Sequence, residues 1–429
     1  MSERVLQVDA LARVEGEGAL YVRLKGNEIE KVEFRIFEPP RFFEAFLQGR
    51  DAREAPDITS RICGICPVAY IMGASQAVEQ AFGAAVTPEI HELRRLIYCG
   101  EWIQSHVLHA AMLHAPDFLG LHDAIKIAEV NPELVRKALR LKKIGNSLME
   151  VIGGRSVHPV NTRVGGFYTA PEKVKVKALL PELEWGIEAA RDVAVAFSKF
   201  DFPDDDFDYH FVSLRHPERY AIAEGRLVSS RGLDMDVSEF NDHFFEEHVD
   251  RSNALHGHMK DGSAYLVGPL ARYANNYAQL TDTAKETAEM CGLGEVVTNQ
   301  YKSILVRMIE TQYALEEAAR IVREYEEPTP AFVDVQPGAG EGHGCTEAPR
   351  GICYHTYKVD ADGCITHAQI VPPTSQNQPQ IEADLARVVA ANLDMADSDL
   401  QWRCEQTIRN YDPCISCATH FLKLTVERA

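Results

Sequence analysis

The sequence predicts an α+β protein dominated by helices, with a core of long helices and small β-sheets near both ends of the chain. Two patterns predict this fold class. Apolar and polar residues alternate in the first 40 residues and again after about residue 328, whereas apolar residues recur every three or four positions between about 41 and 327. No internal repeat or low-complexity linker divides the chain. We therefore expect residues 1–420 to form one interwoven catalytic unit.

The first predicted element is a β-hairpin that turns at Gly26-Asn27. Apolar residues occupy every second position on both sides of this pair: Leu20, Val22, Leu24, Val32, Phe34 and Ile36. Because successive side chains of a strand point to opposite faces, this spacing gives each strand one apolar face.

Long helices are predicted in the middle of the chain. Apolar residues from Ile304 to Val322 step by three or four positions and stop before Pro328, and a second helical pattern runs from Pro88 to His114. The acidic run 204–208 is expected to be a solvated loop, since five residues with four like charges repel one another.

The last part of the chain returns to strand patterns. Residues 352–359 and 364–371 are predicted strands around the turn 360–363. The segment 372–379, Pro-Pro-Thr-Ser-Gln-Asn-Gln-Pro, is so rich in turn-forming residues that we predict a loop. Loops on a rigid scaffold often carry function.

Composition excludes several classes of protein. The chain carries 44 Lys and Arg against 64 Asp and Glu, a formal charge of −20, which disfavours binding to nucleic acid. No apolar stretch reaches 18 residues, so no membrane span is expected. The first residues are charged where a signal peptide would be apolar, which favours a cytoplasmic location.

The ten cysteines are too sparse for a disulfide scaffold, but four of them form two Cys-x-x-Cys pairs. The pairs are Cys63/Cys66 and Cys414/Cys417, and each is a two-thiolate chelate. The six lone cysteines are expected to be small buried hydrophobes: Cys99, Cys291, Cys345, Cys353, Cys364 and Cys404.

Roughly 350 residues separate the two pairs, whereas a zinc ribbon places its second pair within about 20 residues of its first. The separation suits a fold whose two ends converge on one central ion. Spacing alone leaves open that the pairs are two unrelated redox or structural sites. Four thiolates around one metal suit nickel, zinc or iron better than magnesium or calcium.

Four motifs in chain order carry a resemblance to a known family. They are Arg-Val-Glu-Gly at 13–16, Arg-Ile-Cys-Gly-Ile-Cys-Pro at 61–67, Glu-Ala-Pro-Arg-Gly at 347–351 and Asp-Pro-Cys-Ile-Ser-Cys-Ala-Thr-His at 412–420. Together they resemble the large, catalytic subunit of [NiFe]-hydrogenases. The short chain and the Cys-Pro-Val-Ala-Tyr continuation look closest to the cytoplasmic, multimeric, NAD(P)-linked branch, which includes the sulfhydrogenase type.

The resemblance implies a nickel–iron centre. Cys63 and Cys414 would be terminal thiolates on nickel, and Cys66 and Cys417 would bridge it to an iron that carries carbonyl and cyanide ligands. It also implies a second metal site near the C-terminal histidine, usually holding magnesium. The ligands of that site would be Glu44, the backbone oxygen of Ile370 and His420.

The resemblance further implies a polar surround for this centre. Arg350 would overhang the open face of the two metals, held by Asp117 and Asp412, while Pro373 and Thr374 would contact the cofactor and the Thr374 hydroxyl would donate to a cyanide. A guanidinium keeps its charge and would stabilise charge that develops there.

Heterolytic cleavage of H2 gives a hydride and a proton, and the proton needs a base. Cys414 can take it first, and Glu15 is the candidate carboxylate that carries it outward, with a pKa that we expect burial to raise. Two residues depart from the family pattern, Tyr70 and Glu17, which stand where many relatives have histidine. These two departures leave undetermined which hydrogen bonds surround the centre, and they do not affect the four thiolates.

The electrons released from H2 must pass to a partner subunit, because the remaining cysteines of this chain are not clustered in the way that an iron–sulfur centre requires. We expect an iron–sulfur small subunit and further flavin, NAD(P)-binding and iron–sulfur subunits. The resemblance also implies nickel-insertion factors and a maturation endopeptidase that removes residues 421–429 after His420.

Two other classes of protein compete with this interpretation. The related quinone-site subunit of respiratory complex I lacks both cysteine pairs, so their presence argues against it. A zinc-stabilised scaffold would bind zinc without nickel, and metal analysis separates it from a hydrogenase.

Overall fold

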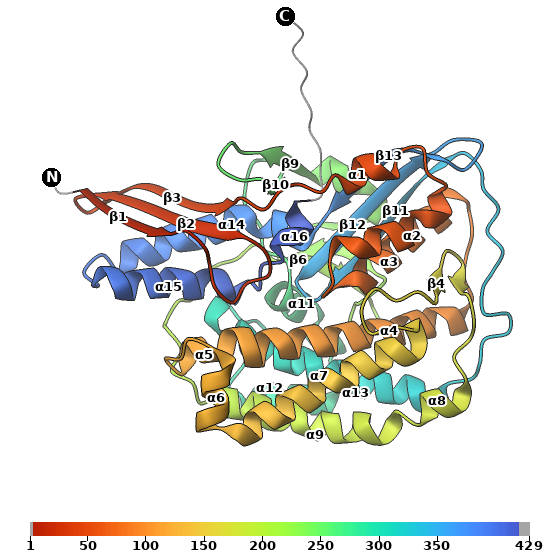
Figure 1. Ribbon diagram of the computed structural model, residues 1–429, viewed down its shortest axis with the longest axis horizontal. Helices are drawn as coiled ribbons and strands as arrows, with labels where there is room; N and C mark the ends of the chain where they lie inside the picture. Colours follow the sequence, from red (N-terminus) through yellow and green to blue (C-terminus); the bar gives the residue numbers. More distant parts are fainter. Residues whose placement is uncertain (1–2, 420–429) are drawn as a thin grey trace, which may run out of the picture.

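Long helices form one side of the molecule in the computed structural model, which describes residues 3–419 (Figure 1). These are α4 (Pro88–Val107), α7 (Pro132–Gly153), α9 (Leu180–Phe197) and α13 (Ser303–Glu324). The predicted helix ending before Pro328 is therefore confirmed. Helix α13 lies against α4 and α9, and its residues from Ser303 to Leu315 are all buried. Because it is surrounded, α13 needs apolar residues on more than one face.

The predicted pattern from Pro88 to His114 is helical throughout but changes type. After α4 the chain continues as a π-helix, Leu108–His114, and then as the short α5, Ala115–Phe118. Such π segments within α-helices are often found at functional sites. Here the π segment carries His109 and His114, which are both buried.

The N-terminal hairpin is confirmed and extends to a three-stranded antiparallel sheet. Its strands are β1 (Glu3–Val8), β2 (Gly18–Lys25) and β3 (Glu28–Ile36). Leu20, Val22 and Leu24 are buried, as the alternation predicts. The sheet lies beside α14 (Pro373–Ala391) and α15 (Asp397–Asn410) at one end of the molecule (Figure 1).

A second antiparallel sheet contains β11 (Gly340–Ala348), β12 (Gly351–Val359) and β13 (Ile365–Val371). The two strands that were predicted are confirmed, whereas β11 was missed because its glycines hide the alternation. Helix α3 (Pro67–Ala81) packs on this strand. A Cβ atom on Gly342 or Gly344 would overlap a carbonyl oxygen of α3, so only glycine allows this close approach.

The structure corrects the predicted loop at 372–379, which is the start of α14. Pro373 stands in the first turn, where its missing N–H is harmless, while Pro379 lies inside the helix. Tertiary bonds compensate for the poor helix propensity. Gln376 Nε2 donates to the carbonyl of Ile352 at 2.7 Å, and the Asn377 side chain bonds the backbone of Val267.

The helical middle is also interrupted by strands that were not predicted, because they are too short to show an alternation. They are β4 (Thr162–Arg163), β5 (Gly166–Phe167), β6 (Val212–Arg215), β7 (Arg226–Ser229), β8 (Asp234–Met235), β9 (Phe244–His248) and β10 (Leu255–Met259). The acidic run 204–208 forms no helix or regular strand, as expected.

Shorter helices connect these elements. They are α1 (Phe43–Leu47), α2 (Ala55–Thr59), α6 (Ala124–Val130), α8 (Lys173–Lys177), α10 (Phe240–His243), α11 (Pro269–Asn276), α12 (Asp282–Met290) and α16 (Ile415–Ala418). The largest hydrophobic core draws on residues from Leu6 to Ala418 and includes both cysteine pairs. Within residues 3–419, none of the helices combines the length and the apolar character that crossing a bilayer requires.

Candidate metal centre

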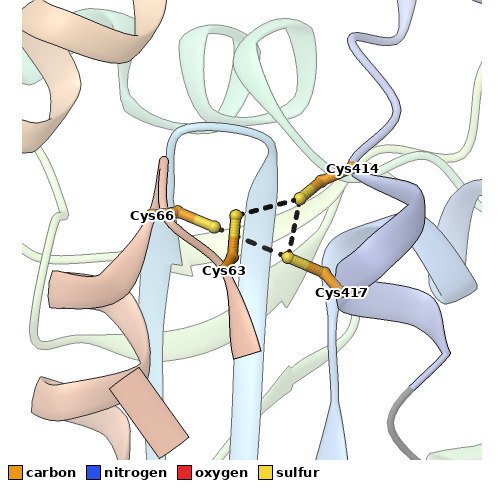
Figure 2. A group of neighbouring side chains, drawn as sticks. All are labelled: Cys63, Cys66, Cys414 and Cys417. Carbon is orange, nitrogen blue, oxygen red and sulfur yellow. Dashed lines mark hydrogen bonds between the residues drawn. The ribbon is translucent and has the colours of Figure 1, made fainter. Parts of the chain in front are cut away.

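The two cysteine pairs, from opposite ends of the chain, meet in the core (Figure 2). The Sγ atoms of Cys63 and Cys414 are 3.3 Å apart, those of Cys66 and Cys417 3.6 Å, and those of Cys414 and Cys417 2.7 Å. All four sulfurs lie within 4.8 Å of one another, and all four residues are buried and unoxidised. The hypothesis of one shared site is therefore confirmed over that of two separate pairs.

One cysteine of each pair directly precedes the first residue of a helix. Cys66 is the residue before α3 and Cys414 the residue before α16. Helix α4 holds the first pair from the side. Glu101 accepts hydrogen bonds from the backbone N–H groups of Val68 at 2.6 Å and Ala69 at 3.1 Å, and Gln104 donates to the carbonyl of Ile65 at 2.6 Å.

The π-helix that continues α4 holds the segment before the second pair. His109 bonds the carbonyl of Arg409 at 2.8 Å, and His114 bonds the side chain of Asn410 at the same distance. A single continuous helical element thus contacts both cysteine segments, which fixes the separation of two stretches that are far apart in sequence.

Mutual contact makes the four thiols unequal acids. Hydrogen bonds from Cys414 and Cys417 hold the pKa of Cys63 well below its usual value, whereas burial raises the pKa values of Cys414 and Cys417. A bound cation would favour the thiolate form of all four.

Arg350 and Asp412 lie beside the sulfurs. Arg350 follows β11, and its Nε donates to the carbonyl of Asp412 at 2.7 Å while Nη2 donates to the Asp412 carboxylate at 3.1 Å. Both side chains are 2% exposed. The Nη1 group of Arg350 is buried without a hydrogen-bond partner among the described residues. The predicted Arg350–Asp412 pair is present.

Asp117 does not belong to that pair, which corrects the prediction. Its carboxylate accepts two hydrogen bonds from Arg409, at 2.7 and 2.9 Å, and one from Arg13 at 2.5 Å. Asp117 lies in α5, where these are the cations that reach it. It therefore joins the N-terminal loop that carries Glu15 to the helix that precedes Cys414.

Glu15 lies next to Cys414. The two residues form an isolated parallel bridge, the carbonyl of Glu15 accepts from Ile415 N at 3.0 Å, and its carboxylate accepts from Ser416 N at 3.1 Å. Glu15 is half-buried, and burial raises its pKa, as does the nearby charge of Cys63. The predicted direction of this shift is found.

The two residues predicted to contact the cofactor, Pro373 and Thr374, lie in the first turn of α14. Thr374 is buried, and its hydroxyl oxygen accepts a hydrogen bond from the backbone N–H of Cys414 at 2.9 Å. The hydroxyl proton remains available as a donor. Pro373 precedes it at the first helical position.

The predicted second metal site is described in part. Glu44, in α1, accepts a hydrogen bond from the backbone N–H of Ile370 at 2.7 Å, so these two predicted ligands are brought together. Both make further interactions. His420 lies outside the described residues, as do the tail residues 421–429.

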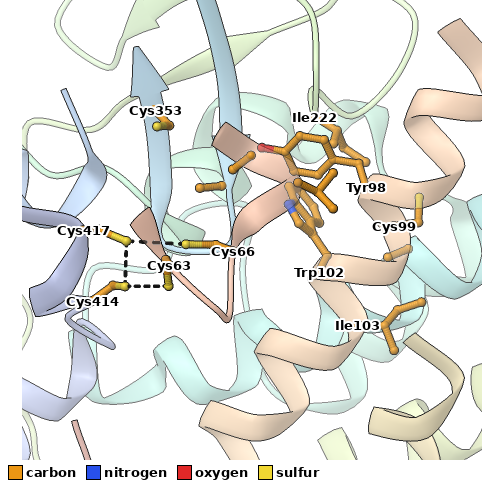
Figure 3. Packing of buried hydrophobic residues seen from close by; sticks show 14 of the residues in the cluster. Cys63, Cys66, Tyr98, Cys99, Trp102, Ile103, Ile222, Cys353, Cys414 and Cys417 are labelled. Atoms are coloured by element: carbon orange, nitrogen blue, oxygen red, sulfur yellow. Dashed lines mark hydrogen bonds between the residues drawn. The ribbon is translucent and has the colours of Figure 1, made fainter. Parts of the chain in front are cut away.

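Sequence reasoning missed three buried side chains that bond the main chain after Cys66 or before Arg350. Glu101 and Trp102 are buried in α4, where Figure 3 labels Trp102, and Arg272 is buried in α11. The available signal was a single charged residue inside an apolar stretch, as in Leu270–Tyr273. Five of the six lone cysteines are buried, as expected, and Cys364 is partly exposed.

The donor set fits a soft metal pair. Four buried sulfurs converge within bonding reach of a shared centre, and an unpaired guanidinium N–H is buried beside them. Thiolates bind nickel and iron well, while the hard cations Mg²⁺ and Ca²⁺ prefer oxygen.

Comparison with known proteins identifies the family to which this chain belongs. The sequence profile of the nickel-dependent hydrogenases matches residues 41–138 and 258–420. The chain belongs to this family. Sulfhydrogenase 1 subunit alpha of Pyrococcus furiosus is 31% identical over 98% of both chains. The NAD-reducing hydrogenase HoxS subunit beta of Cupriavidus necator is 28% identical, over 98% of this chain and 95% of that one.

Solved structures agree. A chain of an NAD⁺-reducing [NiFe]-hydrogenase in the H2-reduced state superimposes with a TM-score of 0.87 at 26% identity, covering 97% of this chain and 99% of that one. The [NiFeSe]-hydrogenase of Desulfovibrio vulgaris Hildenborough, with a TM-score of 0.79 and 22% identity over 98% of this chain and all of that one, shares the fold. The chain is a catalytic large subunit of the [NiFe] type, an oxidoreductase that acts on H2 with nickel and iron.

Proposed function

We propose that the four cysteines hold a nickel–iron pair at which H2 is cleaved heterolytically and reversibly. Cys63 and Cys414 are the terminal nickel ligands, and Cys66 and Cys417 bridge nickel to an iron with carbonyl and cyanide ligands. The convergence of the four sulfurs within 4.8 Å carries this proposal. When bound, the metal pair supplies the soft, electron-rich site that accepts a hydride.

Arg350 acts from outside the sulfur group. Its carbonyl-bonded Nε and carboxylate-bonded Nη2 fix the plane of the guanidinium, and its unpaired Nη1 is left to donate toward the reacting atoms. Its charge interacts with Cys63, Cys66 and Cys414. A donor fixed before the reaction stabilises developing charge without rearrangement.

Cys414 receives the proton and Glu15 passes it outward. The bridge between the two residues supports this order, as does the position of Glu15 between the buried sulfur and the surface. Glu15 is bonded through Ser416 N, so its carboxylate is held near Cys414. Thr374, whose hydroxyl proton is available, donates to a diatomic ligand of the iron.

Glu44, Ile370 and His420 hold a magnesium or similar dication. The contact between the Glu44 carboxylate and the Ile370 backbone supports a shared site, and carboxylate and backbone oxygens suit such an ion.

An iron–sulfur small subunit removes the electrons. The loop between Cys63 and Cys66 reaches the surface at Gly64, beside the exposed side chain of Val157. A cavity of about 720 Å³ adjoins it, lined in part by Phe46, Arg61, Val160 and Tyr168. This face combines exposed apolar side chains with an exposed part of the loop that carries two of the sulfurs, which favours it as the docking site.

Further subunits link the electrons to an NAD(P)-type or similar acceptor in the cytoplasm. The names of the relatives support a multi-subunit enzyme, since one is a sulfhydrogenase subunit alpha and another an NAD-reducing hydrogenase subunit beta. Nickel-insertion factors load the centre, and an endopeptidase then removes residues 421–429. Mass spectrometry of active protein tests this cut, because a chain that still ends at Ala429 in fully active enzyme contradicts it.

Metal analysis and infrared spectroscopy of purified protein test the proposal as a whole. We expect nickel and iron in equal amounts, together with the carbonyl and cyanide stretching bands of the iron. Zinc without nickel, and no such bands, would reject the hydrogenase centre in favour of a zinc scaffold.

A further inference from the structure

Arg272 is a fully bonded buried cation beside the segment that precedes Arg350. It lies in α11, is 0% exposed, and all five of its N–H donors are directed at acceptors. Nε and Nη2 donate to the two oxygens of Glu310, at 2.9 and 2.8 Å, and Nη1 donates to Glu347 at 3.0 Å. The Arg272 charge offsets the effect of burial on Glu310 and lowers its pKa to about 2.

The remaining donors of Arg272 hold main chain rather than side chains. Nη1 also donates to the carbonyl of Ala348 at 2.7 Å, and Nη2 also donates to the carbonyl of Pro349 at 2.8 Å. Trp102 Nε1 donates to the carbonyl just before these, that of Glu347, at 2.8 Å. The Arg272 guanidinium carbon lies 4.5 Å from the Trp102 ring centre. Three successive carbonyls are thus held by two side chains in mutual contact.

The residue that follows these three carbonyls is Arg350. Its own carbonyl is approached so closely by Gly268, the residue before α11, that a Cβ there would lie 2.7 Å from the oxygen. Among residues 3–419, the Arg350 side chain makes hydrogen bonds and an ion pair with Asp412 alone, at the far end of a long side chain. The direction of its unpaired Nη1 therefore depends on a fixed main chain.

We propose that Arg272 is a positioning residue for Arg350: it fixes the main chain 347–349 so that the Arg350 guanidinium stays aimed at the cysteine group. This rests on the proposed function in one respect, since Arg350 has a role only if the nickel–iron centre is present. Lysine cannot replace Arg272, because an ammonium has three donors and no planar fork to span Glu310 and two carbonyls.

The competing explanation is that Arg272 only neutralises two buried glutamates. Arg95 provides a matched control, because it is also buried, lies in a long helix, and bonds a glutamate, Glu317, and a main-chain carbonyl, that of Tyr220. Those bonds do not involve the segment 347–350. Arg95→Lys therefore reports the loss of a buried guanidinium alone.

The test compares Arg272→Lys with Arg95→Lys in the purified enzyme, by hydrogen exchange of the peptide that covers 347–352, by the infrared bands of the iron and by H2 oxidation. We expect Arg272→Lys to speed exchange in this peptide, to shift the bands and to lower H2 oxidation by about 10- to 100-fold with nickel retained. Arg95→Lys should leave exchange in this peptide and the bands at wild-type values. Equal effects of the two variants on the peptide would overturn the proposal.

A double-variant cycle shows whether Arg272 acts through Arg350. Arg350→Lys and the combined Arg272→Lys/Arg350→Lys should oxidise H2 at the same rate, because the second change has nothing left to misplace. Losses that multiply would contradict the proposal. If Arg272→Lys does not fold, Trp102→Phe removes one of the three carbonyl bonds and is measured the same way. Absence of nickel from wild-type protein would instead refute the proposed function, while the exchange comparison would still decide whether Arg272 holds the segment.

Discussion

The sulfur atoms of Cys63 and Cys414 lie 3.3 Å apart although 351 positions separate the two residues in the chain. The bridge between Glu15 and Cys414 brings the N-terminal loop to the same point, and Arg350 reaches it from the turn after β11. The centre is therefore assembled from four segments that lie far apart in the chain and must fold together.

Loss of one terminal thiolate should remove the metal. We expect Cys414→Ala to abolish H2 oxidation and to reduce the nickel content to background, because three sulfurs remain where four converge. Elemental analysis and H2 uptake measure both. Cys291→Ala is the control, since Cys291 is buried away from the group and should keep its nickel. A Cys414→Ala protein with full nickel would show that Cys414 is not a ligand.

A substitution of Glu15 should impair proton transfer without affecting metal binding. Glu15→Gln keeps the size and the acceptor oxygen that bonds Ser416, but an amide cannot take up a proton near neutral pH. We expect exchange between H2 and deuterated water to fall by about 100-fold or more with nickel retained. Glu17→Gln, at an exposed neighbour, should leave this rate unchanged. Loss of nickel from the Glu15 variant would mean that its role is structural.

Removing the Asp117 carboxylate should destabilise the fold. Asp117→Asn leaves the buried Arg409 without its bidentate partner, and breaking such a pair costs about 3–5 kcal/mol. Thermal or urea unfolding measures the loss. Asp192→Asn removes an exposed pair with Lys137 and should change stability by less than about 1 kcal/mol. Similar losses in both variants would refute the assignment of Asp117 as a buried anchor.

Glu101 should fix the position of the first cysteine pair, Cys63 and Cys66. In Glu101→Gln one oxygen still accepts an N–H, but the amide nitrogen faces the other N–H, so the start of α3 must shift. We expect a lower nickel occupancy and shifted infrared bands of the iron. Glu92→Gln, on the same helix but partly exposed, provides the comparison. Wild-type occupancy and bands in the Glu101 variant would contradict a role in placing Cys66.

Acid should destabilise the protein below about pH 6.5 because buried histidines are neutral in the folded state. Burial lowers the pKa of His256 to about 3 and that of His106 to about 4. The unfolded chain binds more protons between about pH 6.5 and these values, so stability falls as pH falls through this window.

A single substitution tests this linkage. His256→Gln should lose less stability than the wild type between pH 6.5 and 5, by up to about 2 kcal/mol, when unfolding is followed at both pH values. His367→Gln, at an exposed position, should show the wild-type dependence. An unchanged slope in the His256 variant would mean that this side chain does not stay neutral when folded.

The sequence by itself determined the local patterns and the ligands. The alternation around Gly26-Asn27, the helical repeat from Ile304 to Val322 and the two strands at 352–371 all became the predicted elements, because the spacing of their apolar residues matches the period of a strand or of a helix. The ordered motifs likewise identified the four thiolates.

Only the tertiary structure decided whether a segment rich in turn-forming residues becomes helix or loop, and which buried charged side chains form ion pairs. Residues 373–379 became helical because their side chains gain tertiary hydrogen bonds that local propensity does not contain. Gln376 donates to the carbonyl of Ile352, and the Asn377 side chain both donates to and accepts from the backbone of Val267. Asp117 paired with Arg409 rather than Arg350 because distance in space, not order in sequence, selects the partner of a buried charge.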